Sequence, residues 1–418
     1  MDAAYPIRPV SEDELGAFFS VIEHAFNSTY PTGSELEHDR PLLELDRTLA
    51  AFDGEKIVGT AAALTMPMSV PGGAVPVAGV TAVAVLPSHR RRGILSGLMR
   101  RQLADVRDRG ESVAALFASE AVIYGRYGYG NATAELDLTI RRGEGAMLAA
   151  AGPGPAPLLR IAEPPDAVAE LAAVFDAAAQ GRPGLPGRDK RWWDWLLWDP
   201  EHRRAGSSPL RCVIAEDEAG PRGYALFGVK PDWEAHGIPS GLLTVRELIA
   251  TDTLAYTALW NDLLTRDLVG EVRARMRPAD EPLLHLLADR RRARPHLLDG
   301  LWVRLVSVPG ALAQRRYAAA VDVVIEVRDD LLAENAGRWR LRAPGPADPA
   351  TGSATCERTS APADLACPVQ ALGAAYLGGT RLGALAGAGL VTEIRPGTMV
   401  ALSAAMSWDP APWCPTSF

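Results

Sequence analysis

The sequence has few cysteines, no long hydrophobic run and no excess of positive charge. Its four cysteines lie far apart in 418 residues, with no CxxC pair and no histidines at metal-ligand spacing. Neither a disulfide framework nor a zinc site is therefore expected, and no metal is assigned. The longest apolar stretches, such as residues 383–391, fall well short of the roughly 20 residues that span a bilayer. We expect no transmembrane helix.

The charge balance and the first residues exclude further classes of protein. The chain has 51 acidic and 43 basic residues, a net charge of −8. This balance disfavours nonspecific binding to nucleic acid or to anionic membranes, and it suits a cationic small substrate. The opening MDAAYPIRPV has an early acidic residue and a proline where a secretory signal would have a basic patch and an apolar core. A cytoplasmic location is expected.

Length and composition predict a chain of several domains. At about 150 residues per domain, three modest domains are expected, and the 48% of hydrophobic residues suffices for several cores. After Arg142 the sequence thins into Ala, Gly and Pro and ends in GPGPAP, a composition typical of a linker. We place domain boundaries so as to give residues 1–155, 156–297 and 298–418.

Hydrophobic periodicity predicts a mixed sheet in the first domain and a degenerate copy of it in the second. In the first domain the expected strands are 49–52, 56–63, 75–85, 112–118 and 131–140, with a helix from residue 94. The first two form an antiparallel hairpin around Asp53-Gly54. In the second domain the expected elements are strands 210–215, 223–230, 242–249 and 271–276 and a helix at 254–268. In the last third we expect strands at 301–307, 321–327 and 338–342 and a helix at 369–376.

The segment VTAVAVLPSHRRRGIL, residues 80–95, predicts a binding site for an anion. A strand ends at a proline, and a basic turn containing Gly93 opens a helix. The free amides and positive dipole end of a helix start, close backbone approach at the glycine, and the arginines would together suit a pyrophosphate. On the residues alone, a solvated basic turn is about equally plausible. The matching junction of the second domain, ELIATDTLAYTALW, has neither glycine nor arginine cluster, so no phosphate site is expected there.

Residues 191–198 form the most aromatic segment, RWWDWLLW. Its four indoles could stack on a sugar or a nucleobase. Helix packing or a subunit contact is the favoured interpretation, about three times as plausible.

The form V-x-V-x-P-x-x-R-R-x-G resembles motif A of the GCN5-related N-acetyltransferases (GNATs), although Leu95 stands where that superfamily usually has Gly or Ala. The RRRG followed by apolar residues, together with SEAVIYGRYGYG at 119–130, more closely resembles the actinobacterial enhanced intracellular survival (Eis) acetyltransferases. The resemblance extends over the whole chain. It implies an α/β (α+β) fold class: two GNAT-like mixed-sheet domains, the second degenerate, plus a C-terminal sterol-carrier-protein-like α+β domain.

The resemblance also implies roles for particular residues. Those that would contact acetyl-CoA are Val83, Ala84 and Val85 at pantetheine, Arg90, Arg91, Arg92, Gly93, Ile94, Leu95 and Ser96 at the pyrophosphate, and Ser119 and Glu120 along the channel. Tyr124 would be the general acid, and the terminal carboxylate of Phe418 the general base. These roles suit the chemistry, because an acceptor amine must lose a proton and the departing thiolate must gain one. Tyr127, Tyr129 and His89 are weaker candidates for proton transfer.

The resulting hypothesis is an acetyl-CoA-dependent N-acetyltransferase that acts on primary amines by direct transfer in a ternary complex. The resemblance implies polycationic acceptors, aminoglycosides foremost, with polyamines or lysine side chains as further acceptors, a link to antibiotic resistance, and a homohexamer. Two alternatives stay open: a lipid carrier that uses the third domain, and an acetyl-CoA-sensing protein without turnover.

Overall fold

The computed structural model describes residues 5–28, 32–148, 155–345 and 353–418. These residues form three sheets, and the chain divides into two compact units. One unit combines the chain up to Thr133 with Gly300–Pro412 and Ser417–Phe418; the other combines Ala134–Asp299 with Trp413–Thr416. The centre of the expected linker, 149–154, lies outside the described residues.

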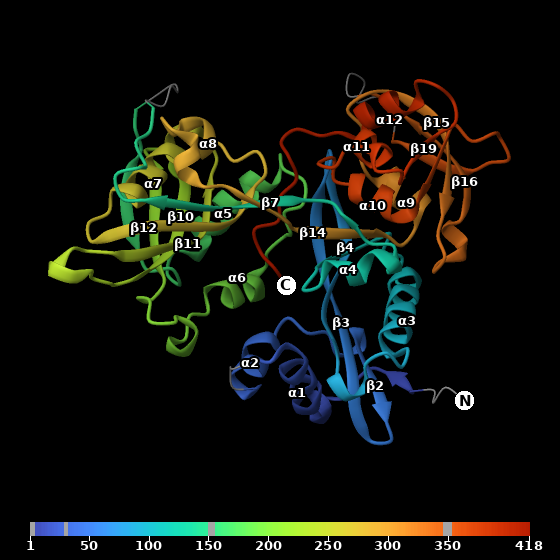
Figure 1. Cartoon of the computed structure of the whole chain (residues 1–418), viewed down its shortest axis with the longest axis horizontal. Helices are drawn as coiled ribbons and strands as arrows, with labels where there is room; N and C mark the ends of the chain where they lie inside the picture. Colours follow the sequence, from blue (N-terminus) through green and yellow to red (C-terminus); the bar gives the residue numbers. More distant parts are fainter. Residues whose placement is uncertain (1–4, 29–31, 149–154, 346–352) are drawn as a thin grey trace. The chain divides into compact units, whose positions relative to one another are not determined.

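The first unit contains a seven-stranded mixed sheet (Figure 1). Its strands in spatial order are β1 (Ile7–Arg8), β2 (Thr48–Asp53), β3 (Lys56–Val70), β4 (Gly73–Val85), β5 (Val113–Phe117), β14 (Leu301–Leu305) and β6 (Gly130–Asn131). The accompanying helices are α1 (Leu15–Phe26), α2 (Thr32–Asp39), α3 (Ile94–Asp108) and α4 (Ala121–Tyr124). The predicted β2–β3 hairpin is confirmed, with Gly54 at a φ of +59° in its turn. In Figure 1, α1 and α3 lie on opposite sides of β3 and β4, which accounts for the almost continuous burial of β3.

The same unit contains a five-stranded sheet built from the last third of the chain. Its strands in spatial order are β17 (Thr355–Arg358), β16 (Gly337–Ala343), β15 (Val321–Arg328), β18 (Leu365–Pro368) and β19 (Thr392–Glu393). The helices of this part are α9 (Val308–Gln314), α10 (Val369–Ala375), α11 (Leu382–Gly387) and α12 (Thr398–Met406).

Two glycines bring helix α10 directly onto the edge of the first sheet. A Cβ atom on Gly130 of β6 would lie 2.0 Å from the carbonyl oxygen of Gln370, and one on Gly373 would lie 2.3 Å from that of Val303 in β14. Side chains at either position would force the backbones apart. The first sheet and the C-terminal domain are therefore built to pack as one unit.

The second unit is a seven-stranded sheet with helices on both faces. Its strands in spatial order are β13 (His296–Asp299), β7 (Ala134–Arg141), β12 (Val269–Pro278), β11 (Gly241–Ala250), β10 (Gly220–Lys230), β9 (Arg211–Asp217) and β8 (Leu158–Ala162). Its helices are α5 (Val168–Ala179), α6 (Lys190–Leu197), α7 (Thr253–Thr265) and α8 (Leu283–Leu286). Alternate residues of β9 join two different cores, one with α7 and one with α5, as expected for a strand buried on both faces.

The sheets divide the chain at different places from the boundaries expected near residues 155 and 298. Strand β7, which the sequence placed in the first domain, pairs with β12 and β13 of the second sheet. Strand β14, expected in the third domain, lies between β5 and β6 of the first sheet. The difference arises because the buried side chains of β7 pack with α7 in the core of the second unit.

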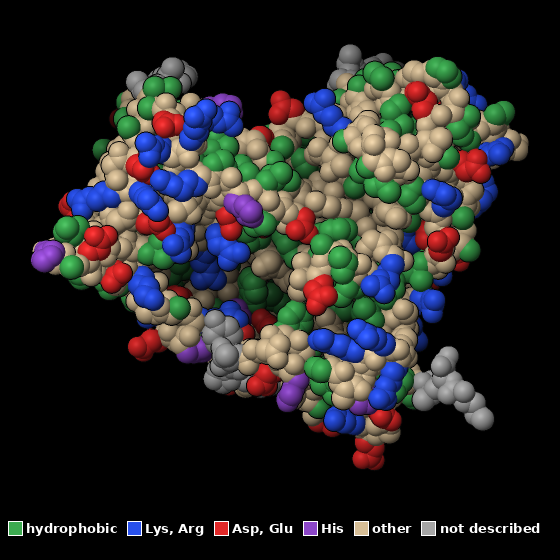
Figure 2. All heavy atoms as spheres, viewed as in Figure 1, with side chains coloured by type: hydrophobic (Ala, Val, Ile, Leu, Met, Phe, Trp, Pro, Cys, Tyr) green, Lys and Arg blue, Asp and Glu red, His purple; other side chains and the backbone are tan. Residues whose placement is uncertain are grey.

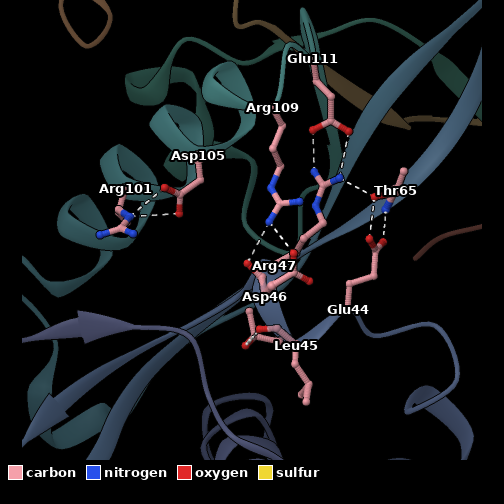
Figure 3. Close-up of polar contacts among 10 residues, drawn as sticks. Glu44, Leu45, Asp46, Arg47, Thr65, Arg101, Asp105, Arg109 and Glu111 are labelled. Atoms are coloured by element: carbon pink, nitrogen blue, oxygen red, sulfur yellow. Dashed lines mark hydrogen bonds and ion pairs between the residues drawn. The ribbon is translucent and has the colours of Figure 1, made fainter.

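A polar network anchors the C-terminal end of α3 to the sheet (Figure 3). Arg47 forms a buried ion pair with Glu111, with 2.6 Å between nitrogen and oxygen, and also donates to the hydroxyl of Thr65. Just beyond α3, Arg109 donates to Asp46 at 2.7 Å, and this contact lowers the pKa of that carboxyl. Removing one partner of a buried ion pair typically costs about 3–5 kcal/mol. This network fixes one end of α3 and leaves its N-terminal end open.

Acidic and basic side chains are interspersed over the face of the molecule that Figure 2 shows. Among the described residues, many charged side chains form ion pairs, such as Arg222 with both Asp217 and Asp252. Within the described ranges, no helix is both long and apolar enough to cross a membrane.

Candidate active site

Strands β4 and β5 are parallel neighbours that separate partway along their length. They pair from Val77 to Gly79, where Gly79 lies opposite Ala115, and their described pairing ends there. Strand β4 nevertheless continues to Val85. Strand β3 pairs with the other edge of β4 over this stretch. The peptide groups of β4 that face β5 beyond Gly79 are therefore available to an extended ligand.

A bulge in β4 accompanies the separation. Ala82 has a φ of +53°, and the register between β3 and β4 shifts between Thr60 and Ala62. The Thr60 hydroxyl donates to the carbonyl of Ala82 at 2.8 Å. Bulges bend and twist a strand locally. The three residues expected to meet pantetheine, 83–85, follow this bulge on the open edge of β4.

The turn after β4 presents a row of backbone amides at the start of α3. Gly93, with a φ of +80°, is the N-cap of α3, and no side chain caps the helix. The first hydrogen bond of helix α3 runs from the Gly97 amide to the Gly93 carbonyl. The amides of residues 94–96 come before this bond and so have no partner within the helix. Arg91 also has a positive φ, of 63°. Alternating conformations of this kind turn successive N–H groups toward one anion.

The basic residues of this turn have different surroundings. Arg90 and Arg91 are exposed and form no ion pair with another described residue, whereas Arg92 donates to the Tyr5 hydroxyl at 3.2 Å. His89 lies 3.1 Å from an Asp53 oxygen and 2.9 Å from the Ser88 hydroxyl. Both ring nitrogens of His89 thus have a partner, and Arg90 and Arg91 remain available to a bound anion.

Tyr124 ends the short helix α4 and is 8% exposed. It packs in one hydrophobic core with residues of β4, β5 and α3, and its ring meets that of Tyr129 edge-on with centroids 6.0 Å apart. Burial raises the pKa of Tyr124 to about 12, with smaller contributions from Tyr127 and Glu120. The phenol is therefore protonated at neutral pH, so it can donate a proton but cannot accept one.

The other two tyrosines of the segment have different surroundings. The hydroxyl of Tyr127 pairs with that of Ser96 on α3 at 3.1 Å. Tyr129 is fully buried, and its hydroxyl has no partner among the described residues. Tyr127 therefore links the turn after α4 to the start of α3, while Tyr129 supports the ring of Tyr124.

Ser119 and Glu120 lie where β5 gives way to α4, and both are exposed. Glu120 is the N-cap of α4 in an extended conformation. The two residues thus border the carboxyl end of β5, beyond the point where it separates from β4.

The C-terminal residue lies against the point where β4 and β5 separate. A Cβ atom on Gly79 would come within 3.1 Å of the Phe418 ring, and that ring meets Phe117 at the end of β5 edge-on, with centroids 5.6 Å apart. Figure 1 likewise marks the C-terminus beside β4. The ring of Phe418 thus packs at the open edge of β4.

The cysteines offer no nucleophile. All four are buried and free, and burial raises the pKa of each thiol to about 12. Thiols of such high pKa carry almost no thiolate at neutral pH. Among the described residues, no group of three or more His, Cys, Asp or Glu side chains is arranged to hold a metal ion.

The junction of the second sheet that corresponds to the amide row is closed by a side chain. Asp252 caps α7, and its Oδ1 accepts hydrogen bonds from the amides of Leu254 and Ala255 at 2.9 and 3.0 Å. These amides are thus occupied, and a carboxylate stands where an anion would bind. In the aromatic segment, Trp192 and Trp193 are buried, and Trp193 packs against Phe175, which fits the packing interpretation for these two indoles.

Sequence reasoning missed two residues of this site, Gly79 and Phe117. A glycine inside a strand often marks close approach by another chain segment, so Gly79 carried a usable signal. Phe117 carried none, because its role depends on a residue at the far end of the chain.

Comparisons with known proteins agree with this architecture. Residues 6–132 and 184–305 each match the family described as acetyltransferase (GNAT) domain, and residues 308–415 match the sterol carrier protein domain. An uncharacterized N-acetyltransferase of Streptomyces avermitilis is 43% identical over 413 residues, 99% of each chain. The N-acetyltransferase Eis of Mycobacterium tuberculosis is 35% identical over 362 residues, 84% of each chain.

Solved structures share the fold of this chain. The crystal structure of Eis1 from Mycobacterium abscessus has a TM-score of 0.83 and 35% identity, covering 99% of this chain and 100% of that one. A GCN5-related N-acetyltransferase from Anabaena variabilis has the same TM-score with 19% identity, and it shares the fold.

Proposed function

Because this chain belongs to the Eis family of GCN5-related N-acetyltransferases, we propose that it transfers the acetyl group of acetyl-CoA directly to a primary amine of a polycationic small molecule. Aminoglycosides are the foremost acceptors, and polyamines and lysine side chains are further ones. The observation that carries the proposal is the terminal residue Phe418, which lies at the separation of β4 and β5.

The residues of the first sheet suit acetyl-CoA. Its pantetheine arm would add to the open edge of β4 at Val83, Ala84 and Val85, where the peptide groups facing β5 are available. The pyrophosphate would meet the amides of residues 94–96 and the unpaired Arg90 and Arg91. Acetyl-CoA supplies the activated acetyl thioester.

Two groups of this chain would move the protons. The Phe418 carboxylate accepts the proton that the acceptor amine loses as its nitrogen forms the new amide bond. Tyr124, whose raised pKa of about 12 keeps the phenol protonated at neutral pH, donates its hydroxyl proton to the departing thiolate sulfur, and the phenolate regains a proton from solvent before the next turnover. Buried thiols with raised pKa values support direct transfer without a covalent acyl-enzyme.

The polycationic class of acceptor is supported by charge. The chain has a net charge of −8, and a carboxylate beside the reacting centre attracts ammonium groups and raises their local concentration. A homohexamer belongs to the same proposal through family resemblance. Native mass spectrometry would test it by looking for a particle of six 44.6-kDa chains.

The decisive experiment is an assay of thiol release from acetyl-CoA with aminoglycosides, polyamines and lysine peptides, on the intact chain and on a variant lacking Phe418. Release that needs both a polycationic amine and Phe418 supports the proposal. Thiol release with monoamines alone would contradict the proposed class of acceptor. Equal release by both proteins would contradict the assignment of Phe418 as the base.

A further inference from the structure

The last residues of the chain belong to two different units. Trp413–Thr416 are part of the second unit, whereas Ser417 and Phe418 belong to the first. Trp413, Cys414 and Thr416 are 6%, 2% and 4% exposed. Chain ends are usually poorly ordered unless something ties them down, so the contacts of this tail need a reason.

A buried ion pair in the second unit holds Thr416. Arg188 donates to both carboxylate oxygens of Glu247, at 2.9 and 2.6 Å, and its Nη2 also donates to the Thr416 hydroxyl. Tyr224 donates to the same carboxylate at 2.6 Å. The side chains of Arg188 and Glu247 are each 1% exposed, and the guanidinium lies 3.8 Å from the centroid of the Phe175 ring. A buried network whose charges are all paired is rigid.

The tail also occupies the place where the second sheet opens. Strands β11 and β12 pair only as far as Val245 and Ala274, much as β4 and β5 do in the first sheet. Here Arg277 donates to the carbonyl of Leu248 on β11 at 3.0 Å, and the indole of Trp413 donates to the carbonyl of Met276 at 2.5 Å. In the first sheet the peptide groups of β4 beyond Gly79 face an open slot. In the second sheet, carbonyl groups at the corresponding opening accept hydrogen bonds from Arg277 and Trp413.

Two further contacts fix Trp413. Its amide donates to the carbonyl of Pro183 at 2.8 Å, and the guanidinium of Arg277 lies 5.1 Å from the centroid of its ring. A Cβ atom on Gly184 would come within 2.7 Å of the Trp413 carbonyl oxygen. This close fit of backbone to backbone requires glycine at residue 184.

We propose that the second domain, in which Asp252 caps the helix start that would hold a phosphate, acts as a clamp for the C-terminal tail, and that Arg188, through Thr416, is a positioning residue for the Phe418 carboxylate. The proposal rests on the proposed function, since it requires that carboxylate to be the base. Only Ser417 separates Thr416 from Phe418, so the Cα atoms of these two residues can be no more than about 7 Å apart. An anchored Thr416 therefore restricts the conformations open to the chain end, and a proton acceptor that is ordered in advance reacts more readily.

The test uses Thr416→Val, which removes the hydroxyl but keeps the shape of the side chain, because removing Arg188 would leave Glu247 unpaired and risk unfolding. We expect kcat to fall about tenfold, since a small misplacement of a catalytic group has effects of this order, with an unchanged KM for acetyl-CoA. Thr416→Ser, which retains the hydroxyl, should restore kcat to within about twofold. Thr398→Val, at a buried threonine distant in the chain from the tail, is the matched control and should change nothing.

A second measurement tests how firmly the C-terminal tail is held and does not depend on catalysis. Carboxypeptidase A removes a C-terminal aromatic residue only when the chain end is free, so Thr416→Val should release Phe418 at least about five times faster than the intact protein. In a variant that already lacks Phe418, Thr416→Val should have no further effect on residual turnover. Unchanged release would overturn the clamp, and so would an unchanged kcat in a protein whose activity depends on Phe418. If deleting Phe418 itself leaves kcat unchanged, the proposed function is wrong. The rate at which carboxypeptidase A releases Phe418 still shows whether Thr416 holds the tail.

Discussion

The ring of Phe418, the last residue of the chain, meets the ring of Phe117 at the end of β5 edge-on, with centroids 5.6 Å apart and an interplanar angle of 80°. This contact places the ring of Phe418 at the point where β5 separates from β4, the position of the base in the proposed function. The position of a single residue thus joins the end of the chain to the proposed chemistry of the first sheet.

Extending the chain by one glycine should lower kcat by about 100-fold or more, because it moves the carboxylate while keeping the Phe418 ring. The binding of acetyl-CoA, measured by calorimetry, should not change. Phe418→Leu is the control, because it keeps the carboxylate and removes only the contact with Phe117. Its kcat should stay well above that of the extended chain. Equal losses in the two variants would indicate that the ring, and not the carboxylate, matters.

Tyr124→Phe should lower kcat by about 100-fold with little change in acetyl-CoA affinity, because it removes the proton donor and leaves the buried ring. Tyr129→Phe is the matched control. Its hydroxyl is buried without a described partner, so its removal should leave kcat unchanged and stability equal or about 1 kcal/mol higher. Because the pKa of Tyr124 is raised to about 12, the pH profile of kcat should show no loss from this group between neutral pH and about pH 10. A Tyr124→Phe enzyme with normal kcat would assign the acid elsewhere.

Gly93→Ala should raise the KM for acetyl-CoA about tenfold, since an alanine at a φ of +80° is strained by about 1–2 kcal/mol and would distort the amide row. Gly110→Ala is closely matched. Gly110 follows α3, has the same φ of +80°, and like Gly93 has no atom within 4 Å of an added Cβ. Both variants should lose similar stability in thermal melts, but only Gly93→Ala should weaken acetyl-CoA binding. Equal KM values would show that this turn does not hold the pyrophosphate.

Glu135 makes the stability of the second unit depend on pH. Burial and the nearby Asp137 raise its pKa from the ordinary 4.5 to about 7. The folded state therefore binds more protons than the unfolded state between these values, so this stabilising contribution is complete below pH 4.5 and is lost as the pH rises through 7. Glu135→Gln should raise Tm at pH 8 by about 2 °C, a figure reduced for partial exposure, and have no such effect at pH 4.

Glu144→Gln should change Tm at pH 8 in the opposite direction to Glu135→Gln. Arg294 and Arg292 lower the pKa of Glu144, so its contribution is present at neutral pH and is lost on acidification. This variant should therefore lower Tm at pH 8. If Glu135→Gln lowered Tm at that pH as well, the raised pKa of Glu135 would be incorrect.

Local patterns predicted the strand, turn and helix over residues 80–95, because periodicity and turn chemistry depend on neighbouring residues. They also predicted no phosphate site in the second domain, and the structure shows Asp252 capping the helix start at that junction. The assignment of Phe418 came from family resemblance, since no local signal distinguishes it from any other chain end.

Pairing between distant segments could not be predicted. Strand β7 reads as a strand in either sheet, and its pairing with β12 depends on residues far along the chain. The contact between Arg188 and Thr416 spans 228 residues, so no motif contains both. Sheet membership and tail anchoring are decided by complementary surfaces that form only when the chain is folded.

The place of β14 in the first sheet also has a consequence for biosynthesis. A ribosome makes β5 and β6 early, but β14, which pairs with both, follows the whole of β7 to β13. The first sheet therefore cannot close until residues 301–305 have left the exit tunnel, whereas the strands of the second sheet emerge in one continuous stretch. In contrast to the usual N-terminal-first order of folding during synthesis, the middle of this chain is free to fold first, while the nascent N-terminal part carries exposed strand edges of the kind that chaperones protect.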